Sequence, residues 1–281
     1  MLAKLSISTW SARKFDKRVS DEINAREGAV SDAGRYNKHL LGGSSAAQKH
    51  ADVISAAGAA RLVHYAQTLP WSDEGWRLLP TDNWTRYTDA IRAATAKFQA
   101  NAQDFIAEYH DMKDRAKVLL NGMFKEEDYP SLSEIARRFS CSIEYAPIPA
   151  TGDLRVALPA GQVEEIERQI EERIGRATED AMRDAWSRLA EVVERVKSRL
   201  SDPDAVFRDS LIGNVRETCD ILSRLNLTQD PSFESMRRRI DRELGDLDPQ
   251  SLREWKPERD KAARKAQEIV DAMSGLYGAA T

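Results

Sequence analysis

A seven-residue spacing of large apolar side chains constrains this chain more than any other feature. Smaller or apolar residues follow four positions after each member, from Thr88 to Met123. This heptad seam predicts one helix over about residues 82–121, with one dry face and one wet face. Gly122 is well placed to end that helix, because glycine readily adopts the left-handed conformation. The seam consists of Trp84, Ile91, Phe98, Phe105, Met112 and Leu119.

A second apolar stripe runs along residues 161–200, with members that advance by threes and fours. The remaining positions are densely charged. So narrow a stripe on so polar a helix predicts packing against one long partner, and we expect the 82–121 helix in antiparallel orientation. The stripe consists of Val163, Ile166, Ile170, Ile174, Ala177, Ala181, Ala185, Leu189, Val192, Val196 and Leu200.

In the segment between these helices, the spacing of apolar residues changes from a helical pattern to a strand pattern. Ser131 to Glu134 reads as a capping box that opens a short helix through about Phe139, with Ile135 and Phe139 on one face. Residues 142–146 and 154–158 then alternate around a turn rich in Pro and Gly, which predicts a β-hairpin over 142–158. An isolated hairpin is marginal in water. Residues 5–9 also alternate, and they offer a third strand.

Further helices are indicated on both sides of this central region. An Ala-rich stretch over 45–69 predicts one helix, with Val53, Ile54, Ala57, Leu62 and Tyr65 available for burial. Near the C-terminus, Asp-Pro pairs at 202, 230 and 248 predict three helix starts, because Asp caps free backbone N–H groups and Pro fits the first helical position. We expect these helices near 203–226, 231–245 and 249–275. Their expected inward positions are Phe207, Leu211, Val215, Leu222, Met236, Ile240 and Leu244.

The predicted fold is therefore mainly α: a long antiparallel coiled-coil-like helix pair with a small β-hairpin and additional C-terminal helices. Three regions are expected. Residues 1–80 form a basic N-terminal segment and an Ala-rich helix, 81–201 form the helix pair with its hairpin, and 202–281 form a C-terminal helical region.

The composition indicates the kind of cellular compartment in which the protein works. The chain has 281 residues, a net charge of −4 and two cysteines, Cys141 and Cys219, too few for a disulfide framework or a Cys-x-x-Cys zinc site. The N-terminus lacks the apolar core of a signal peptide, and no window is apolar enough for a membrane helix. We expect a soluble protein of a reducing cytoplasm.

The common catalytic motifs are missing from the sequence. It contains no phosphate-binding loop with its lysine, no Gly-x-Ser-x-Gly elbow and no His-Glu-x-x-His helix. The histidines at 39, 50, 64 and 110 lack the spacing of metal ligands and read as surface or capping residues. Acidic runs such as 126–128, and the run Arg237-Arg238-Arg239, read as solvated faces. We predict no catalytic, cofactor-binding or metal-binding residue and no cofactor. A site built from distant residues is the remaining enzymatic alternative.

The N-terminal segment interleaves cations with aromatic residues. Residues 1–50 hold nine Lys and Arg against five Asp and Glu, a net charge of +4. Cations attract phosphates and aromatic rings stack on bases, so these side chains are candidates for contact with an anion or a nucleic acid. The alternative is that this segment is a packing arm, which packs against the rest of the protein. In that case Trp10, Phe15 and Tyr36 are buried, and the cations lie over an acidic helix elsewhere in the chain. The candidate cations are Arg13, Lys14, Lys17, Arg18, Arg35 and Lys38.

Several short strings of the first 158 residues resemble an uncharacterised helical protein family of tailed bacteriophages and prophages. They are Trp10 with 13–17, Gly34 to Lys38, Thr68 to Trp71, Asp128 to Pro130 and Gly152 to Val156. The family has Phe where Leu154 stands. The resemblance implies a bacterial host cytoplasm and a role in a phage programme, and it supplies no activity.

These observations favour a non-enzymatic helical interaction or assembly protein. We expect it to self-associate, with the heptad seam as the candidate assembly surface, and to act on a host or phage protein. The alternative is a nucleic-acid-associated factor in phage genome processing that uses the basic N-terminal segment.

Overall fold

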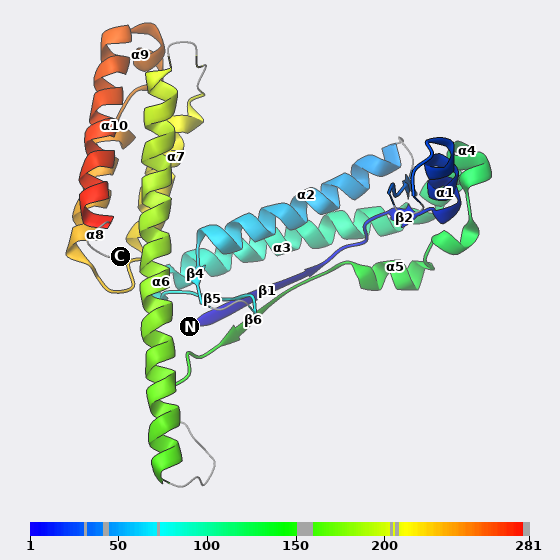
Figure 1. Ribbon diagram of the computed structural model, residues 1–281, viewed down its shortest axis with the longest axis horizontal. Helices are drawn as coiled ribbons and strands as arrows, with labels where there is room; N and C mark the ends of the chain where they lie inside the picture. The colour runs from blue at the N-terminus through cyan, green and yellow to red at the C-terminus, as the bar shows by residue number, and fades with distance from the viewer. Residues whose placement is uncertain are drawn as a thin grey trace. The chain divides into compact units, whose positions relative to one another are not determined.

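In the computed structural model the chain is mainly α-helical with small β elements, as the sequence predicts (Figure 1). The structure describes residues 1–30, 33–41, 45–71, 74–150, 160–202, 205 and 208–277. This part of the chain holds ten α-helices and six strands. It forms two compact units: unit 1 contains residues 1–4, 65–87 and 144–281, and unit 2 contains residues 5–64 and 88–143.

The strands form a four-stranded antiparallel sheet, in the order β4-β5-β1-β6, and a separate two-stranded ribbon of β2 and β3. Leu2 pairs with Leu78, which also pairs with Leu69, so three leucines meet on adjacent strands. The expected N-terminal strand is confirmed as β1, and the first arm of the expected hairpin is confirmed as β6. The second arm, 154–158, lies outside the described residues. The strands are β1 Leu2–Ser8, β2 Arg13–Phe15, β3 Asn37–His39, β4 Leu69–Pro70, β5 Trp76–Leu78 and β6 Ser140–Ala146.

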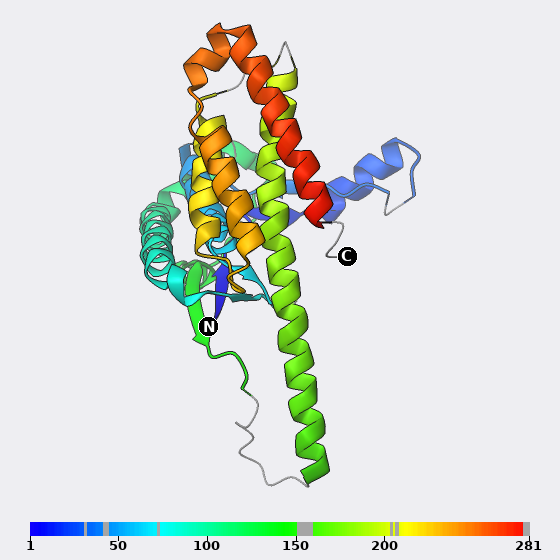
Figure 2. The ribbon, with the colours of Figure 1, turned by 90° about the vertical axis from the view of Figure 1, so that its left-hand side faces the viewer.

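Unit 1 is built around one long helix, α6, with α7 and α10 packed along it and α8 beside α7 (Figures 1 and 2). The stripe of α6 from Ala181 to Leu200 is buried together with Ala262, Ala266 and Ile269 of α10. Small side chains on both helices permit close approach. The helices are α6 Ala160–Ser201, α7 Ser210–Ser223, α8 Pro231–Ile240, α9 Pro249–Glu254 and α10 Lys256–Tyr277.

No clear coiled-coil pair of residues 82–121 with 161–200 is seen in the described residues. The buried members of the two stripes lie in different hydrophobic clusters, one in each unit. The physical reason is that a heptad or near-heptad stripe specifies a dry face and not the helix that covers it. In this chain, helices from other parts of the sequence cover both stripes.

The Asp-Pro starts of the C-terminal helices are confirmed at two positions. The Asp230 carboxylate accepts a hydrogen bond from Ser232 N (2.8 Å), and the Asp248 carboxylate accepts one from Ser251 N (2.8 Å). Residues 203 and 207 lie outside the described part, and α7 begins at Ser210. The helix expected over 249–275 is divided, because Trp255 is extended (φ −117°, ψ 99°) and Pro257 then opens α10.

The C-terminal end of α2 is closed by two arginines of unit 1. Arg188 of α6 donates to the carbonyls of Ala66 and Thr68 (both 3.0 Å), and Arg77 donates to Thr68 Oγ1 (2.7 Å). Cations stabilise the free carbonyls at a helix C-terminus. Burial, and then the charge of Arg188, lowers the pKa of Arg77.

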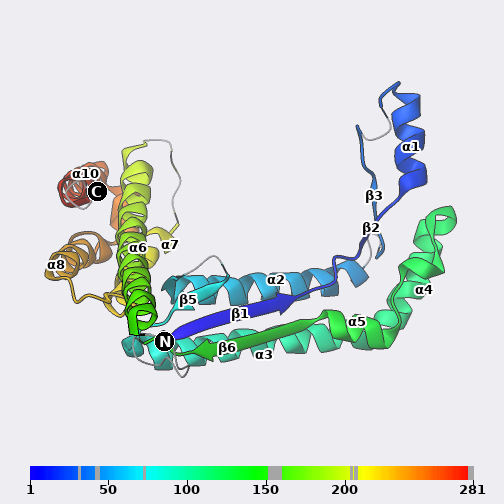
Figure 3. The same ribbon diagram turned by 60° about the horizontal axis from the view of Figure 1, so that its bottom comes forward.

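In unit 2, α2 and α3 lie side by side (Figure 3). Seam residues Phe98, Phe105 and Met112 are buried together with Val53, Ala56 and Ala57 of α2. The expected 82–121 helix is divided at Glu108, whose ψ of 5° departs from helical geometry. The capping box is confirmed, since Ser131 and Glu134 bond reciprocally at the start of α5. The helices are α1 Lys17–Arg26, α2 Ser45–Ala66, α3 Trp84–Ala107, α4 Tyr109–Leu120 and α5 Leu132–Arg138.

The prediction of buried positions on α2 is wrong for three of the five residues. Val53 and Ala57 are buried, whereas Ile54, Leu62 and Tyr65 are exposed. The buried face instead consists largely of alanines, and an Ala-rich helix has too little contrast between its faces to show from sequence which one is covered.

Candidate functional site

The basic N-terminal segment forms the β2–β3 ribbon and the start of α1, all within unit 2 (Figure 3). Arg13 pairs with His39, Lys14 with Lys38 and Phe15 with Asn37. Because side chains alternate along a strand, Lys14 and Lys38 lie on one face of the ribbon, and Arg13 and Phe15 lie on the other. Backbone bonds from Leu40 N to Ala12 O (2.9 Å) and from Asp16 N to Tyr36 O (3.0 Å) close its two ends.

The ribbon is anchored by one tryptophan. Trp10 is buried and packs edge-on against Tyr109, with ring centroids 6.0 Å apart. Its carbonyl oxygen lies 2.6 Å from His50 Nε2. The packing-arm alternative is therefore confirmed for Trp10, while Phe15 and Tyr36 are exposed.

Helix α1 begins beside the ribbon because Asp16 caps it. The Asp16 carboxylate accepts a hydrogen bond from Val19 N at 3.2 Å, which satisfies one of the free N–H groups of the first turn. Lys17 and Arg18 follow at the exposed start of the helix. Arg18 forms an ion pair with Glu22 (2.6 Å), whereas Lys17 makes none within the described part of the chain.

Lys38 differs from the other candidate cations because it is buried. Its Nζ lies 2.5 Å from Asp128 Oδ2 and 3.9 Å from Asp16 Oδ2, and it donates to the carbonyl of Met123 at 2.9 Å. A buried ammonium needs such partners to offset the loss of hydration. Lys38 thus joins the ribbon to the 126–128 turn, and it is not available to a ligand.

A cleft of about 780 Å³ opens between the ribbon, the start of α1 and the 126–128 turn. Lys14, Lys17 and Lys125 lie on it, and none of the three forms an ion pair with a described residue. The acids of the lining fall into two groups. Asp16 and Asp128 are bound to Lys38, whereas Asp21 and Glu127 are exposed. The cleft is lined by Lys14, Phe15, Asp16, Lys17, Arg18, Asp21, Lys38, Lys125, Glu127 and Asp128.

An aromatic ring with a stacked cation lies on the ribbon. The guanidinium of Arg35 lies 4.7 Å from the ring centroid of Phe15. Phe15 is 38% exposed and Tyr36 37% exposed, well above the values of core aromatics in this chain. Together with the cations around it, this arrangement can bind an anionic ligand that also has flat apolar surfaces.

Of the six candidate cations, the structure brings Lys14, Lys17 and Arg18 together at the cleft, and Arg35 stacks on Phe15 of its lining. Arg13 lies on the opposite face of the ribbon from Lys14, and Lys38 is buried. Sequence reasoning missed Lys125, because it precedes an acidic run that reads as solvated. We call the exposed set the basic surface. It consists of Lys14, Phe15, Lys17, Arg35, Tyr36 and Lys125, with Arg18 held by Glu22 at its edge.

The heptad seam is mostly internal. Ile91, Phe98, Phe105 and Met112 are buried, and Trp84 is half-buried against Tyr145 with ring centroids 4.9 Å apart. Leu119 is 57% exposed, and its neighbour Val118 is 80% exposed. Only the end of the seam thus presents apolar surface.

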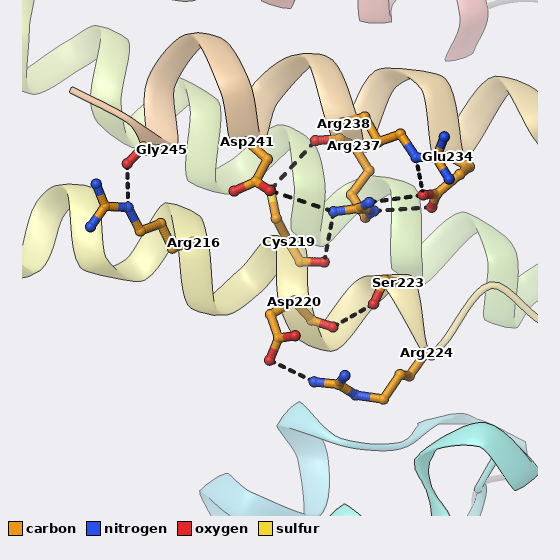
Figure 4. Close-up of polar contacts among 10 residues, drawn as sticks. All are labelled: Arg216, Cys219, Asp220, Ser223, Arg224, Glu234, Arg237, Arg238, Asp241 and Gly245. Carbon is orange, nitrogen blue, oxygen red and sulfur yellow. Dashed lines mark hydrogen bonds and ion pairs between the residues drawn. The ribbon is translucent and has the colours of Figure 1, made fainter.

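Two members of the arginine run at 237–239, Arg237 and Arg238, belong to a polar network of α8, and Arg237 joins this network to Cys219 of α7 (Figure 4). Arg237 and Arg238 both bind Glu234, at 2.8 and 2.7 Å, and Arg239 binds Glu243 at 3.1 Å. The Cys219 thiol lies 3.7 Å from the carbonyl of Arg237, and burial raises its pKa to about 12. Each arginine already has a carboxylate partner, so the run is structural.

The side chains of Trp71, Trp76 and His64 also pack inside the protein and do not form a surface site. Both tryptophans pack against the core of unit 1. His64 is buried, so its expected position at the surface is wrong. Among the described residues, no group of three or more His, Cys, Asp and Glu side chains is arranged to hold a metal ion. No helix in the described ranges is long and apolar enough to cross a bilayer.

Comparison with protein-family models, curated proteins and solved structures finds no match.

Proposed function

We propose that this chain is a non-enzymatic helical interaction protein of phage type. It self-associates and acts on a host or phage protein in the bacterial host cytoplasm. The proposed cellular location is inferred from the sequence resemblance of residues 1–158. The proposed interaction role is inferred from the heptad seam.

One observation carries the proposal: the last position of the seam is exposed, whereas the four positions before it are buried. Val118 and Leu119 are adjacent, 80% and 57% exposed, and lie at the end of α4. Asn121, with φ of 43°, turns the chain away directly afterwards. Burial of a Val or Leu side chain stabilises a complex by about 1.5–3 kcal/mol, so covering this pair favours association.

A second copy is a suitable partner for this helix end. Closed symmetric pairing places the same patch of both copies in contact, so each copy covers the apolar pair of the other. The exposed pair is small, and the charged residues around it, such as Asp114 and Lys117, would form a polar rim.

The test is the light-scattering mass of the purified chain and of two matched variants. Leu119→Glu introduces a charge at the proposed contact. Leu62→Glu introduces the same charge at a leucine of α2 that is 73% exposed. We expect a defined oligomer for the original chain and for Leu62→Glu, and a monomer for Leu119→Glu.

Two outcomes would contradict the proposal. A monomer at high concentration would remove self-association altogether. Equal loss of the oligomer in both variants would show that the end of α4 is not its contact surface.

A further inference from the structure

We infer that the basic surface of unit 2 binds a single-stranded nucleic acid. The inference goes beyond the proposed function, because it uses a different surface from the end of α4 and a different class of partner.

The first argument is the distribution of charge between the units. Unit 2 holds 17 Lys and Arg against 15 Asp and Glu, a net charge of +2, whereas unit 1 holds 25 against 31, a net charge of −6. The overall charge of −4 conceals this difference. The positive excess lies in the unit that presents the basic surface, where it can attract phosphates.

The second argument is that the two buried carboxylates of the cleft are already held by a buried cation. Asp16 and Asp128 lie at the bottom of the cleft, and both face the buried ammonium of Lys38. They cannot turn outward without leaving that charge unpaired, which is costly in a buried site. Lys14, Lys17 and Lys125 form no ion pair with a described residue, and they outnumber the two exposed acids of the lining, Asp21 and Glu127.

The third argument separates a single strand from a duplex. Phe15 and Tyr36 present exposed rings beside the cations, and Arg35 already covers one face of Phe15. Such rings gain energy by stacking on bases, and a duplex keeps the faces of its bases inside. The cleft, at about 780 Å³, is within the size range of sites for small organic ligands and has room for a nucleotide.

The experiment measures the fluorescence anisotropy of a labelled oligothymidylate of about 20 nucleotides, long enough to exceed known single-strand site sizes. A duplex of the same length is measured in parallel, at about 50 and 200 mM salt. We expect saturable binding of the single strand, weaker binding of the duplex, and an affinity that falls as salt rises. Four to five phosphate contacts give a slope of about −3 in log K against log salt.

Two charge-reversal variants locate the binding surface. Lys14→Glu/Lys17→Glu alters the basic surface, and Arg92→Glu/Lys97→Glu makes the same change of charge at exposed positions of α3 in the same unit. The first is expected to lose binding by at least tenfold, and the control is expected to lose much less. Phe15→Leu keeps the apolar volume and removes the ring, and it is expected to weaken binding of the single strand by about fivefold or more. Circular dichroism establishes that each variant is folded.

Three results would overturn the inference. They are an absence of single-strand binding, equal losses in the two charge-reversal variants, and a duplex that binds as tightly as the single strand. The last result would mean that the surface recognises phosphate charge alone.

Discussion

Lys38 Nζ lies 2.5 Å from Asp128 Oδ2, and the two side chains are only 2% and 6% exposed. This ion pair connects the N-terminal ribbon to a turn far along the chain. It holds the floor of the cleft in place while the lysines of the rim remain exposed.

Replacement of Lys38 is expected to destabilise unit 2 severely. Lys38→Met leaves the Asp128 carboxylate buried without its counter-charge, at a cost of about 3–5 kcal/mol. Lys49→Met is the matched control, since the Lys49–Glu108 pair is partly exposed and such pairs contribute about 0–1 kcal/mol. Urea unfolding, followed by hydrogen exchange of unit 2 peptides, compares the two. Similar losses of unfolding free energy in the two variants would show that the buried Lys38 ion pair stabilises the protein no more than the partly exposed Lys49 pair.

Gly245 and Gly213 are expected to respond oppositely to substitution by alanine. A Cβ at Gly245 would lie 2.9 Å from Asp241 Oδ1 and 3.3 Å from Arg216 Cγ, where Arg216 also donates to the Gly245 carbonyl (Figure 4). Such overpacking costs about 1–3 kcal/mol. A Cβ at Gly213, within α7, meets nothing within 4 Å. Gly213→Ala is expected to stabilise by about 0.5–1 kcal/mol through helix propensity. Thermal unfolding of both variants measures the difference, and a stabilising Gly245→Ala would show that this turn is not tightly packed.

Alkaline pH is expected to weaken unit 2 through Tyr129. Burial raises the pKa of Tyr129 to about 12, and its hydroxyl donates to the carbonyl of Leu40 at 2.6 Å. The folded state therefore retains a proton that the unfolded chain loses near pH 10. This contribution to stability is complete below about pH 10 and is lost as pH rises through about 12.

The check is the pH dependence of unfolding free energy in the original chain and in Tyr129→Phe. The variant lacks the titrating hydroxyl, so its stability should fall less steeply between about pH 10 and 12. Equal slopes would assign the alkaline loss to other groups, such as Tyr109, whose pKa burial also raises to about 12.

The two thiols are expected to react at very different rates. Burial raises the pKa of both, but Cys141 is half-buried on β6, whereas Cys219 is fully buried and its pKa is about 12. Since the thiolate is the reactive form, Cys141 should react with a disulfide reagent at neutral pH, and Cys219 should react only on unfolding. Cys141→Ala and Cys219→Ala assign the two phases. Rapid labelling of Cys141→Ala would reveal local opening near α7.

The sequence predicted features that depend on near neighbours. The caps at Asp230 and Asp248 and the box at Ser131 were predictable, because each involves a side chain and a backbone group two or three residues apart. The alternation of residues 5–9 and 142–146 likewise predicted strands, since a half-buried strand shows a period of two.

Features that depend on distant partners were not predictable. Nothing near Lys38 in the sequence indicates that Asp128 neutralises it, so it was grouped with exposed cations. The heptad seam showed which face of α3 is dry but not that α2 covers it. The exposed rings of Phe15 and Tyr36 differ from buried Trp10 only through contacts that the fold creates.

The four boundaries between the two units fall inside β1, α2, α3 and β6, and not in loops. Neither unit is therefore a continuous segment, and no single cut in the chain separates one unit from all of the other. A truncated version that ends at any one of these boundaries would divide a strand or a helix and remove part of unit 1, and one that ends at residue 4, 64 or 87 would also remove all or part of unit 2. Partial digestion should accordingly yield fragments that stay associated. All of unit 2 is present once residue 143 has been synthesised, whereas unit 1 should acquire its structure only after its C-terminal helices have followed.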